Sequence, residues 1–345
     1  SGFKDHRNKI DFKSISNKSI LRIIKAYKLA KEHQKNLNSD LRIRGLWDEW
    51  ILTNFSYLID TLNSENIDKL RLVFDNILRN PCTVGLGSFD EWNRSKRFFG
   101  KHYIKYVWWD YFEKLSKLNS DKKIIFPLVG NPSGLYFKNT VVPYDSLRHA
   151  YHAEEIKNCL RDCEQKTIVE IGGGYGGLAF QLAQTLFTEN YNYRLYDIPE
   201  VAAIASAFLL TSLSEDNVRL YGEESIYLKE GSQIGIYPHF AIDELEPQTV
   251  DLIYNSCSFS EMDGNTSNYY LTVIEKVVRK YFMHNNHDTK FIFKEADGTN
   301  SENIIGSNLI PDTSSFKLIY KKPRTHGLPE DKPFVSHEFL YEKMN

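Results

Sequence analysis

The stretch from Thr167 to Ala179, TIVEIGGGYGGLA, constrains this chain most. A short apolar strand ends near Glu170, and a glycine-rich turn leads from it directly into a helical segment. Because glycine has no Cβ, such a turn lets a ligand lie against bare backbone at a helix N-terminus. A second apolar strand, YNYRLYD, follows and ends at Asp197. Together the turn and the acid predict a βαβ unit that binds an adenosine.

The glycines of this unit match two kinds of adenosine site. Gly172, Gly174 and Gly177 satisfy G-x-G-x-x-G, with Asp197 as the acid that binds a ribose. Against a pyrophosphate ligand, Glu170 stands two residues before the first glycine, where negative charge would repel a phosphate. A carboxylate there suits a locally cationic ligand that carries an amine and a sulfonium. The unit also begins after a long helical region, and both features favour S-adenosylmethionine over NAD or FAD.

The motif resembles the first motif of class I S-adenosylmethionine-dependent methyltransferases, with Asp197 matching their ribose-binding acid. Together with the strings YDIPEV and NSCSFSEM, it resembles the sugar O-methyltransferases of bacterial surface-polysaccharide synthesis. This likeness covers about residues 124–345. It implies S-adenosyl-L-methionine as cofactor and methylation of a sugar hydroxyl in a capsule, a lipopolysaccharide, a related glycan or a precursor.

From Thr167 onward the pattern alternates between strands and helices. Strands are expected at Thr167–Glu170, Arg194–Tyr196, Val218–Tyr221, Asp251–Asn255, Lys290–Lys294, Phe316–Tyr320 and Glu338–Tyr341. Helices are expected at Gly177–Leu186, Ile198–Leu213 and Tyr269–Tyr281. This alternation predicts an α/β fold with a mainly parallel sheet covered by helices on both faces. The resemblance implies a Rossmann-like methyltransferase sheet of seven strands, the last of them antiparallel.

The region before this unit is predicted to be helical. Apolar residues at helical spacing predict helices at Ser19–Glu32, Leu46–Leu62, Ile67–Arg79 and Arg97–Leu118. A hairpin around Lys138-Asn139 and a helix starting near Tyr144 then lead into the glycine-rich strand. We therefore divide the chain into a helical region, 1–123, and a methyltransferase domain, 124–345. The helical region is expected to serve as a lid, in oligomerisation or in acceptor binding.

Composition limits the partners and the compartment. The formal net charge of −2 gives no electrostatic reason to expect nucleic acid. No apolar run is long enough to span a bilayer. The four cysteines lack paired C-x-x-C spacing and predict buried, reduced thiols in a cytoplasmic protein. The expected partners are a sugar or glycan acceptor and either a second copy of the chain or another enzyme of glycan assembly.

Ligands of an open parallel sheet collect where the strands end at their carboxyl side. The strand ends and the glycine turn give the expected cofactor-binding residues: Glu170, Gly172, Gly174, Tyr175, Gly177, Asp197, Ile198, Asn255 and Ser256. Arg148, one helical turn before His152, is expected to clamp a carboxylate of the methionyl group or of an acidic sugar. Tyr144 and His326 are further expected contacts of the acceptor.

A sugar hydroxyl is a poor nucleophile, so methyl transfer to it needs a general base within hydrogen-bond reach. Glu261, just after the fourth strand, and His152, on the helix approaching the cofactor, are the preferred candidates. The other candidates are Asp263, His149, His239, His326 and His337. For each histidine an ordinary exposed or packed role is the competing interpretation. No spacing of His, Asp and Glu predicts a metal site.

Two other functions are compatible with the same glycine motif. An NAD-dependent sugar oxidoreductase would use the same fingerprint, although Glu170 and the position of the unit along the chain argue against it. A non-catalytic, methyltransferase-like subunit of a polysaccharide-assembly complex would keep the fold without turnover. The glycines and Asp197 indicate competence to bind the cofactor rather than catalysis.

Overall fold

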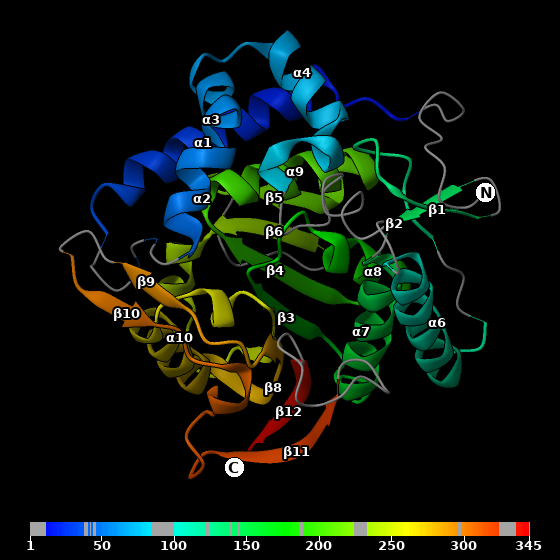
Figure 1. Cartoon of the computed structure of the whole chain (residues 1–345), viewed down its shortest axis with the longest axis vertical. Coiled ribbons are helices and arrows are strands. Elements are labelled where there is room, and N and C mark those ends of the chain that lie inside the picture. Colours follow the sequence, from blue (N-terminus) through cyan, green and yellow to red (C-terminus); the bar gives the residue numbers. More distant parts are fainter. Residues whose placement is uncertain are drawn as a thin grey trace.

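The computed structural model describes residues 12–37, 41, 43, 46–83, 100–121, 125–137, 140–143, 145–186, 189–223, 233–294, 298–323 and 336–344. Within these residues an eight-stranded sheet forms the centre, in the order β11-β12-β8-β7-β3-β4-β6-β5 (Figure 1). Its strands are β3 (Lys166–Ile171), β4 (Tyr191–Asp197), β5 (Val218–Leu220), β6 (Gln233–Pro238), β7 (Val250–Ser256), β8 (Val278–His287), β11 (Phe316–Pro323) and β12 (Ser336–Lys343). Two small hairpins pair β1 (Gly134–Phe137) with β2 (Thr140–Pro143), and β9 (Ile292–Lys294) with β10 (Asn300–Glu302).

The pairing of these strands confirms the predicted fold class. Strand β3 pairs in parallel with β4 on one side and with β7 on the other. The last strand, β12, runs antiparallel between β8 and β11, as the resemblance implies. The sheet has eight strands rather than the seven expected, because β6 inserts in parallel between β4 and the predicted edge strand β5. After β3 the chain builds outward first on the β4 side and then on the β7 side, so a topological switch point lies between β3 and β7.

Two strands of the sheet differ from the sequence prediction. The fifth strand was expected at Lys290–Lys294, but the sheet strand is β8, and residues 292–294 belong to the β9–β10 hairpin. The preceding helix ends at Val277 instead of Tyr281. The chain continues from there as strand β8, so residues 278–281, which the helical pattern included, are extended. Strand β6 was not predicted, because Gly235 and Pro238 weaken its strand pattern.

Helices cover the sheet on both faces. In the part of the chain that the structure describes they are α1 (Asn17–Gln34), α2 (Leu46–Asn54), α3 (Ser56–Asn63), α4 (Ile67–Asp75), α6 (Gly100–Leu118), α7 (Ser146–Cys159), α8 (Gly177–Thr185), α9 (Pro199–Ser212) and α10 (Gly264–Val277). The stretch predicted as one helix from Leu46 to Leu62 is two helices, α2 and α3, separated at Phe55. Alternate strand residues point to opposite faces, so Ile168 packs in the cluster beneath α8 and α9 while Val169 packs in the cluster that contains α10.

The N-terminal helices share the core of the sheet domain. Figure 1 shows α1 to α4 stacked beyond the β5 edge, next to α9. Ile20 and Ile23 of α1 are buried in the same apolar cluster as Phe208 of α9. Lys31 of α1 also forms an ion pair of 2.8 Å with the buried Glu200 of α9. The packing of α1 therefore extends the hydrophobic core that lies on this face of the sheet.

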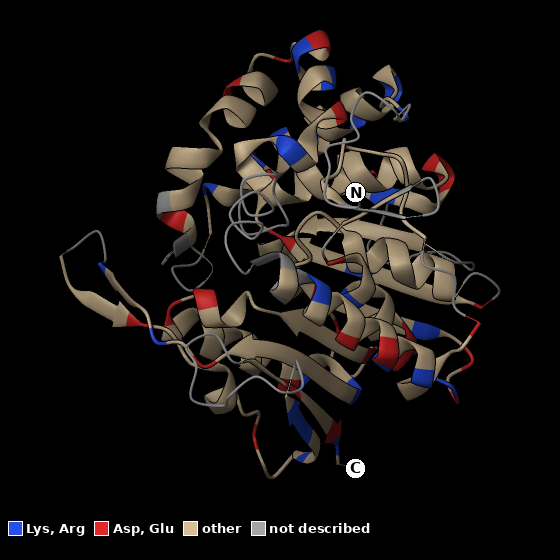
Figure 2. Ribbon diagram, turned by 45° about the vertical axis from the view of Figure 1, so that its right-hand side comes forward, with Lys and Arg blue, Asp and Glu red and all other residues tan. Residues whose placement is uncertain are grey.

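Charges of both signs are interspersed over the helices in view in Figure 2. None of the helices described is both long enough and apolar enough to cross a membrane. The four cysteines are all unpaired thiols; Cys82 and Cys163 are buried, whereas Cys159 and Cys257 are partly exposed. The expectation of reduced thiols therefore agrees with the structure, but burial holds for only two of them.

Candidate functional site

The glycine turn after β3 has the backbone geometry that its sequence predicts. Gly172, Gly174 and Gly176 have φ angles of 73°, 58° and 87°, in the left-handed region that favours glycine. A Cβ on Gly172 would collide with the side chain of Ser258 in the loop after β7. The turn thus needs glycine both for its conformation and for its close approach to a neighbouring loop, and it leads into α8 at Gly177.

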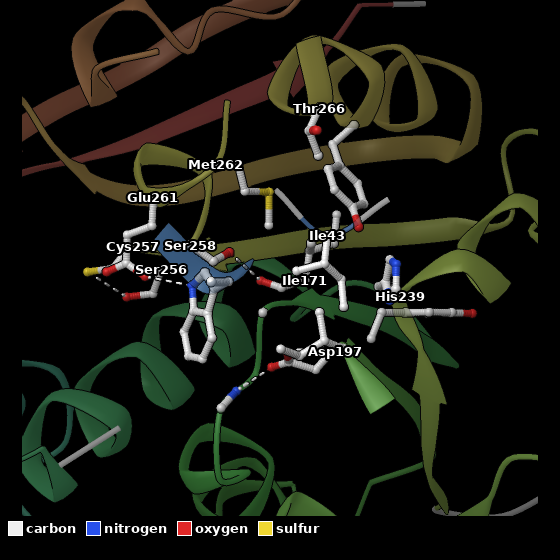
Figure 3. Close-up of a pocket in the computed structure, with 16 residues that line it drawn as sticks. Ile43, Ile171, Asp197, His239, Ser256, Cys257, Ser258, Glu261, Met262 and Thr266 are labelled. Atoms are coloured by element: carbon white, nitrogen blue, oxygen red, sulfur yellow. Dashed lines mark hydrogen bonds between the residues drawn. The ribbon is translucent and has the colours of Figure 1, made fainter. Parts of the chain in front are cut away.

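Asp197 ends β4 beside this turn, and both of its carboxylate oxygens accept backbone hydrogen bonds. Gly174 N–H donates to Oδ2 over 2.9 Å, and Ile198 N–H donates to Oδ1 over 2.8 Å (Figure 3). Burial raises the pKa of Asp197 to about 7, although these two backbone donors act to lower it. The fold therefore fixes a carboxyl group with a pKa of about 7 against the glycine turn.

A pocket opens at the ends of β3, β4 and β7, at the switch point of the sheet. The space between its lining residues is about 790 Å³, a volume that includes open solvent. Its lining consists of Ile43, Trp47, Ile171, Gly172, Gly174, Tyr196, Asp197, Ile198, His239, Ser256, Cys257, Ser258, Glu261, Met262, Thr266 and Tyr270. The lining thus combines two carboxyl groups, Asp197 and Glu261, with aromatic and aliphatic side chains.

The loop after β7 is held by a network of buried amides. Asn255 donates from its side chain to Ile171 O over 2.9 Å, and its own side-chain oxygen accepts a hydrogen bond from Asn286 over 2.8 Å. Asn286 in turn accepts from the backbone of Ser260 over 3.1 Å. Cys257 has a φ of 67°, rare for a residue with a side chain. This network fixes the loop that carries Ser256, Cys257 and Ser258 into the pocket.

The N-terminal region forms the roof of the pocket. Trp47 of α2 lines it, and its indole N–H donates to Glu261 Oε2 over 3.1 Å (Figure 3). Leu41 O lies 2.7 Å from Nε2 of His239, at the end of β6. Burial lowers the pKa of His239 to about 4, so this imidazole is neutral at physiological pH. Segments far apart in the sequence thus close over the site from above.

Glu170 lies beneath the glycine turn, outside the lining of the pocket. It is buried, and the hydroxyl of Tyr193 donates to its carboxylate. Burial raises the pKa of Glu170 to about 7, partly offset by Tyr193 and by the charge of Arg148. This carboxyl group therefore faces the turn from inside the fold, and any contact with a ligand would be through the turn rather than across the pocket.

Arg148 lies where α7 meets the end of β7. Its guanidinium donates to Ser256 Oγ over 2.8 Å and forms an ion pair of 3.3 Å with Asp145. Next to it the rings of His149 and Tyr175 are in edge contact, with centroids 5.8 Å apart. A Cβ on Gly177 would collide with His149. A cation and two aromatic rings are thus assembled at the glycine turn, beside the pocket.

The structure brings together most of the residues singled out from the sequence. Seven of them line the pocket: Gly172, Gly174, Asp197, Ile198, His239, Ser256 and Glu261. Arg148, Tyr175 and Gly177 adjoin it, and Asn255 supports it from within the sheet. Tyr144 and His326 lie outside the described residues.

His152 does not line the pocket. It is fully buried between α7 and β12, against the ring of Tyr254. Of the remaining base candidates, Asp263 accepts the backbone N–H groups of Asn265 and Thr266 and caps α10. His337 pairs with Asp288 at 3.5 Å. Among the preferred bases only Glu261 therefore faces the pocket.

Several lining residues had no signal in the sequence. Trp47 and Ile43 reach the pocket from the N-terminal region, which no local motif connects to the glycine turn. Met262, Thr266 and Tyr270 follow β7 on the loop and on α10, at helical spacing typical of any packed helix. Only the assembled fold identifies these residues as part of the site.

Comparisons with known proteins give only weak similarities. No family model matches the chain, and no curated protein matches it in sequence. Among solved structures, an S-adenosylmethionine-dependent methyltransferase from Mesorhizobium loti is 14% identical over 56% of this chain and 97% of that chain, with a TM-score of 0.36. A candidate RNA methyltransferase from Pyrococcus horikoshii is 13% identical over 68% of this chain and 96% of that chain, with a TM-score of 0.36. Because one fold hosts many functions, the activity has to be argued from the site itself.

Proposed function

We propose that this protein is an S-adenosylmethionine-dependent O-methyltransferase that acts on a sugar hydroxyl of a bacterial surface glycan or its precursor. The observation that carries the proposal is the pairing of Asp197 with the glycine turn. Its carboxylate is oriented by the N–H groups of Gly174 and Ile198 at the mouth of the pocket. There it can accept hydrogen bonds from both hydroxyls of a ribose.

The sheet supports a methyltransferase over an NAD-dependent oxidoreductase. A dinucleotide-binding Rossmann sheet has the parallel order 3-2-1-4-5-6. Here an antiparallel strand, β12, is inserted between β8 and β11. Two carboxyl groups at the site, Asp197 and Glu170, would also repel a pyrophosphate near the turn.

The remaining groups fit the other parts of the cofactor. S-Adenosylmethionine would supply the methyl group from its sulfonium, and the chain would bind and orient it. Arg148, which contacts Ser256 and Asp145, is proposed to bind the carboxylate of the methionyl group. The bare backbone of Gly172 and Gly174 allows close approach, and the uncharged ring of His239 and the ring of Tyr270 are proposed to contact an adenine.

The acceptor is proposed to bind between the roof and the loop after β7. Methyl transfer from a sulfonium is an in-line displacement, so positioning supplies much of the acceleration. Glu261 is proposed as the general base, and the indole of Trp47 that donates to it is an apolar platform for a sugar ring. The resemblance of the NSCSFSEM string, which contains Ser256 and Glu261, supports a sugar as acceptor.

Calorimetry with S-adenosylhomocysteine tests the cofactor assignment. We expect a dissociation constant on the order of micromolar for the native chain. Asp197→Ala should weaken binding about tenfold or more, because a charge-assisted hydrogen bond contributes about 1.5–3 kcal/mol. The matched control Asp162→Ala changes an exposed carboxylate after α7 and should leave binding unchanged. Binding of NADH but not of S-adenosylhomocysteine would contradict the proposal.

Turnover assays test the acceptor and the base. Nucleotide-linked sugars and glycan fragments are incubated with labelled S-adenosylmethionine, and methylated products are identified by mass spectrometry. Glu261→Gln should lower kcat at least a hundredfold while S-adenosylhomocysteine affinity changes less than threefold, since removal of a general base typically costs 10²–10⁴ in rate. Glu164→Gln, on an exposed turn, is the matched control. Cofactor binding with no transfer to any sugar would instead support the non-catalytic subunit.

A further inference from the structure

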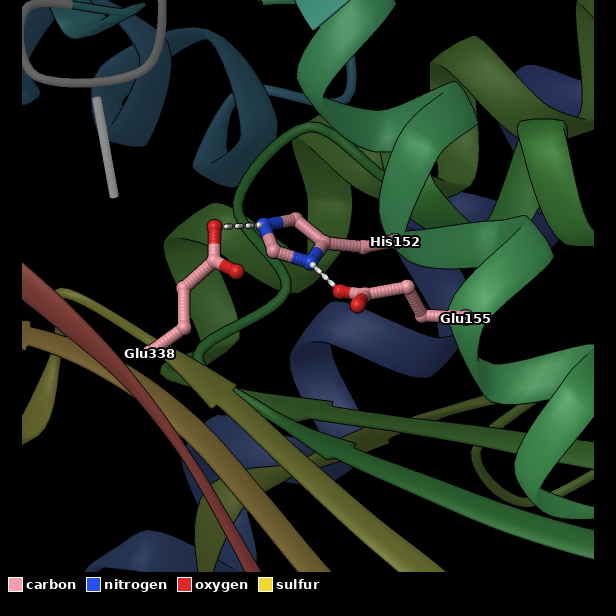
Figure 4. A group of neighbouring side chains, drawn as sticks. All are labelled: His152, Glu155 and Glu338. Atoms are coloured by element: carbon pink, nitrogen blue, oxygen red, sulfur yellow. Dashed lines mark ion pairs between the residues drawn. The ribbon is translucent and has the colours of Figure 1, made fainter. Parts of the chain in front are cut away.

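A second cluster of titratable side chains lies between α7 and β12, outside the pocket. It consists of His152 and Glu155 on α7 and Glu338 on β12 (Figure 4). His152 and Glu338 have 0% of their surface exposed, and Glu155 has 9%. Buried imidazole and carboxylate groups at one point are costly unless each is paired or binds a ligand. This cluster therefore needs a physical explanation.

The polar atoms that face one another in the cluster lack hydrogen-bond partners. They are Nδ1 and Nε2 of His152, Oε2 of Glu155 and Oε1 of Glu338. Nδ1 lies 3.4 Å from Glu155 Oε2, and Nε2 lies 3.7 Å from Glu338 Oε1. Imidazolium–carboxylate hydrogen bonds would be about 2.7–2.9 Å long. Each contact is therefore a long ion pair, one at each ring nitrogen, and leaves the facing carboxylate oxygen without a hydrogen bond (Figure 4).

The other oxygens of the two glutamates face Lys322 of β11. Its ammonium group pairs with Glu155, lies 3.3 Å from Glu338 Oε2 and donates to the Tyr151 hydroxyl over 2.6 Å. Lys322 thus contacts the two glutamates from one side, and His152 contacts them from the other.

We propose that His152, Glu155 and Glu338 bind a divalent transition-metal ion, with Zn²⁺ or Mn²⁺ as the chemical class. One imidazole nitrogen and two carboxylate oxygens form a donor set that these ions accept. The two positive charges of the ion balance the two glutamates, and Lys322, which is partly exposed, turns outward to water. Three protein ligands leave one coordination position for a water molecule or the Tyr151 hydroxyl.

The spacing of the donors fits such an ion after a small closure. One donor atom from each residue lies within 4.8 Å of the others. Ligand atoms around a tetrahedral ion are about 3.4 Å apart when each bond is about 2.1 Å long. The three side chains would therefore close by up to about 1.4 Å around the ion.

The ion would tie α7 to the last strand of the sheet. Helix α7 carries Arg148 one turn before His152, at the glycine turn. Fixing α7 to β12 would hold Arg148 in place without any contact between the ion and the pocket. This metal site is therefore structural, and its existence does not depend on the proposed methyl transfer.

Metal titration of the full chain tests the site. After chelator treatment, ZnCl₂, MnCl₂ or CoCl₂ is added and binding is followed by calorimetry, with the visible spectrum of the Co²⁺ form reporting nitrogen and oxygen ligands. We expect one equivalent to bind. His152→Gln and Glu338→Gln should each weaken binding at least tenfold and remove the Co²⁺ spectrum. His337→Gln, a largely buried histidine on the same strand as Glu338, is the control and should change neither.

A lysine variant distinguishes a metal site from a simple ion-pair cluster, even if the buried variants fold poorly. Lys322→Met removes the group that competes with the ion, so it should tighten metal binding about tenfold and make thermal stability depend on the metal. Lys317→Met changes an exposed lysine of the same strand and should have no effect. No metal binding by the native chain, or the same affinity in Lys322→Met and His152→Gln as in the native chain, overturns the proposal.

Discussion

At the residue scale, opposing effects on Asp197 make the proposed ribose site sensitive to pH. Burial raises the pKa of this carboxyl group to about 7, and two backbone N–H donors keep it from rising further. Ribose hydroxyls donate to the ionised form, so the affinity for S-adenosylhomocysteine should fall as pH drops through 7. We expect about tenfold weaker binding at pH 6 than at pH 8, measured by calorimetry.

The control for this prediction is Asp197→Asn, which keeps the shape of the side chain and removes its titration. Its affinity should be lower than that of the native chain at pH 8 and nearly independent of pH. Glu170 titrates in the same range, since burial also raises its pKa to about 7. A pH dependence in Asp197→Asn as steep as in the native chain would assign the effect to Glu170 and contradict the prediction.

The raised pKa of Glu170 predicts how the stability of the fold depends on pH. Its pKa is about 7 in the folded chain against an ordinary value of 4.5, so its contribution to stability is present below pH 4.5 and lost as pH rises through 7. That difference corresponds to roughly 3 kcal/mol. Glu170→Gln should therefore raise the free energy of unfolding in urea by up to about 3 kcal/mol at pH 8 and by little at pH 5. Destabilisation at pH 8 would show that the carboxylate is stabilised in a way that burial does not account for.

At the element scale, the turn between β3 and α8 depends on glycine for space as well as for conformation. A Cβ on Gly172 would collide with Ser258, so Gly172→Ala should displace the turn from the loop after β7. We expect at least tenfold weaker binding of S-adenosylhomocysteine. The matched control is Gly298→Ala, whose φ of 85° is just as unfavourable for alanine but whose Cβ would meet nothing within 4 Å. Equal loss of affinity in both variants would contradict the prediction that the collision with Ser258 weakens binding.

The turn and the strand ends flanking it could be predicted from sequence because their signals are local. Gly172 and Asp197 lie on one βαβ unit, where residue type and spacing fix the geometry. Strand β8 could not be located, because Val277 and Val278 fit the end of a helix as well as the start of a strand, and only pairing with β7 decides between them. Local pattern therefore located the centre of the sheet better than its later strands.

Contacts between distant segments explain the parts of the site that were missed. Trp47 reaches Glu261 from the N-terminal region, and Asn286 supports Asn255 from the neighbouring strand. Neither a tryptophan on a helix nor an asparagine near the end of a strand indicates such a role by its residue type alone. Helical spacing likewise predicted His152 to lie near the cofactor, one turn after Arg148. In the structure its ring turns away from the pocket toward Glu338. One helical turn determines which residues are neighbours, but packing determines what each side chain meets.

At the scale of the whole molecule, the shared core of α1 and α9 couples the N-terminal helices to the sheet. Ile23 has 1% of its surface exposed within this core. Ile23→Ala should therefore lower the free energy of unfolding of the entire chain by about 2–5 kcal/mol. Leu21→Ala, on the same helix with 54% of its surface exposed, is the control and should cost less than about 0.5 kcal/mol.

The two variants also test whether the helices unfold together with the sheet. Circular dichroism, tryptophan fluorescence and retention of S-adenosylhomocysteine are followed through one urea titration. Because Ile23 packs with α9, and Trp47 and Ile43 cover the pocket, we expect coincident midpoints that shift together in Ile23→Ala. An early transition that leaves ligand binding intact would contradict this coupling. It would make residues 1–123 a separately folding domain, with the pocket complete without its roof.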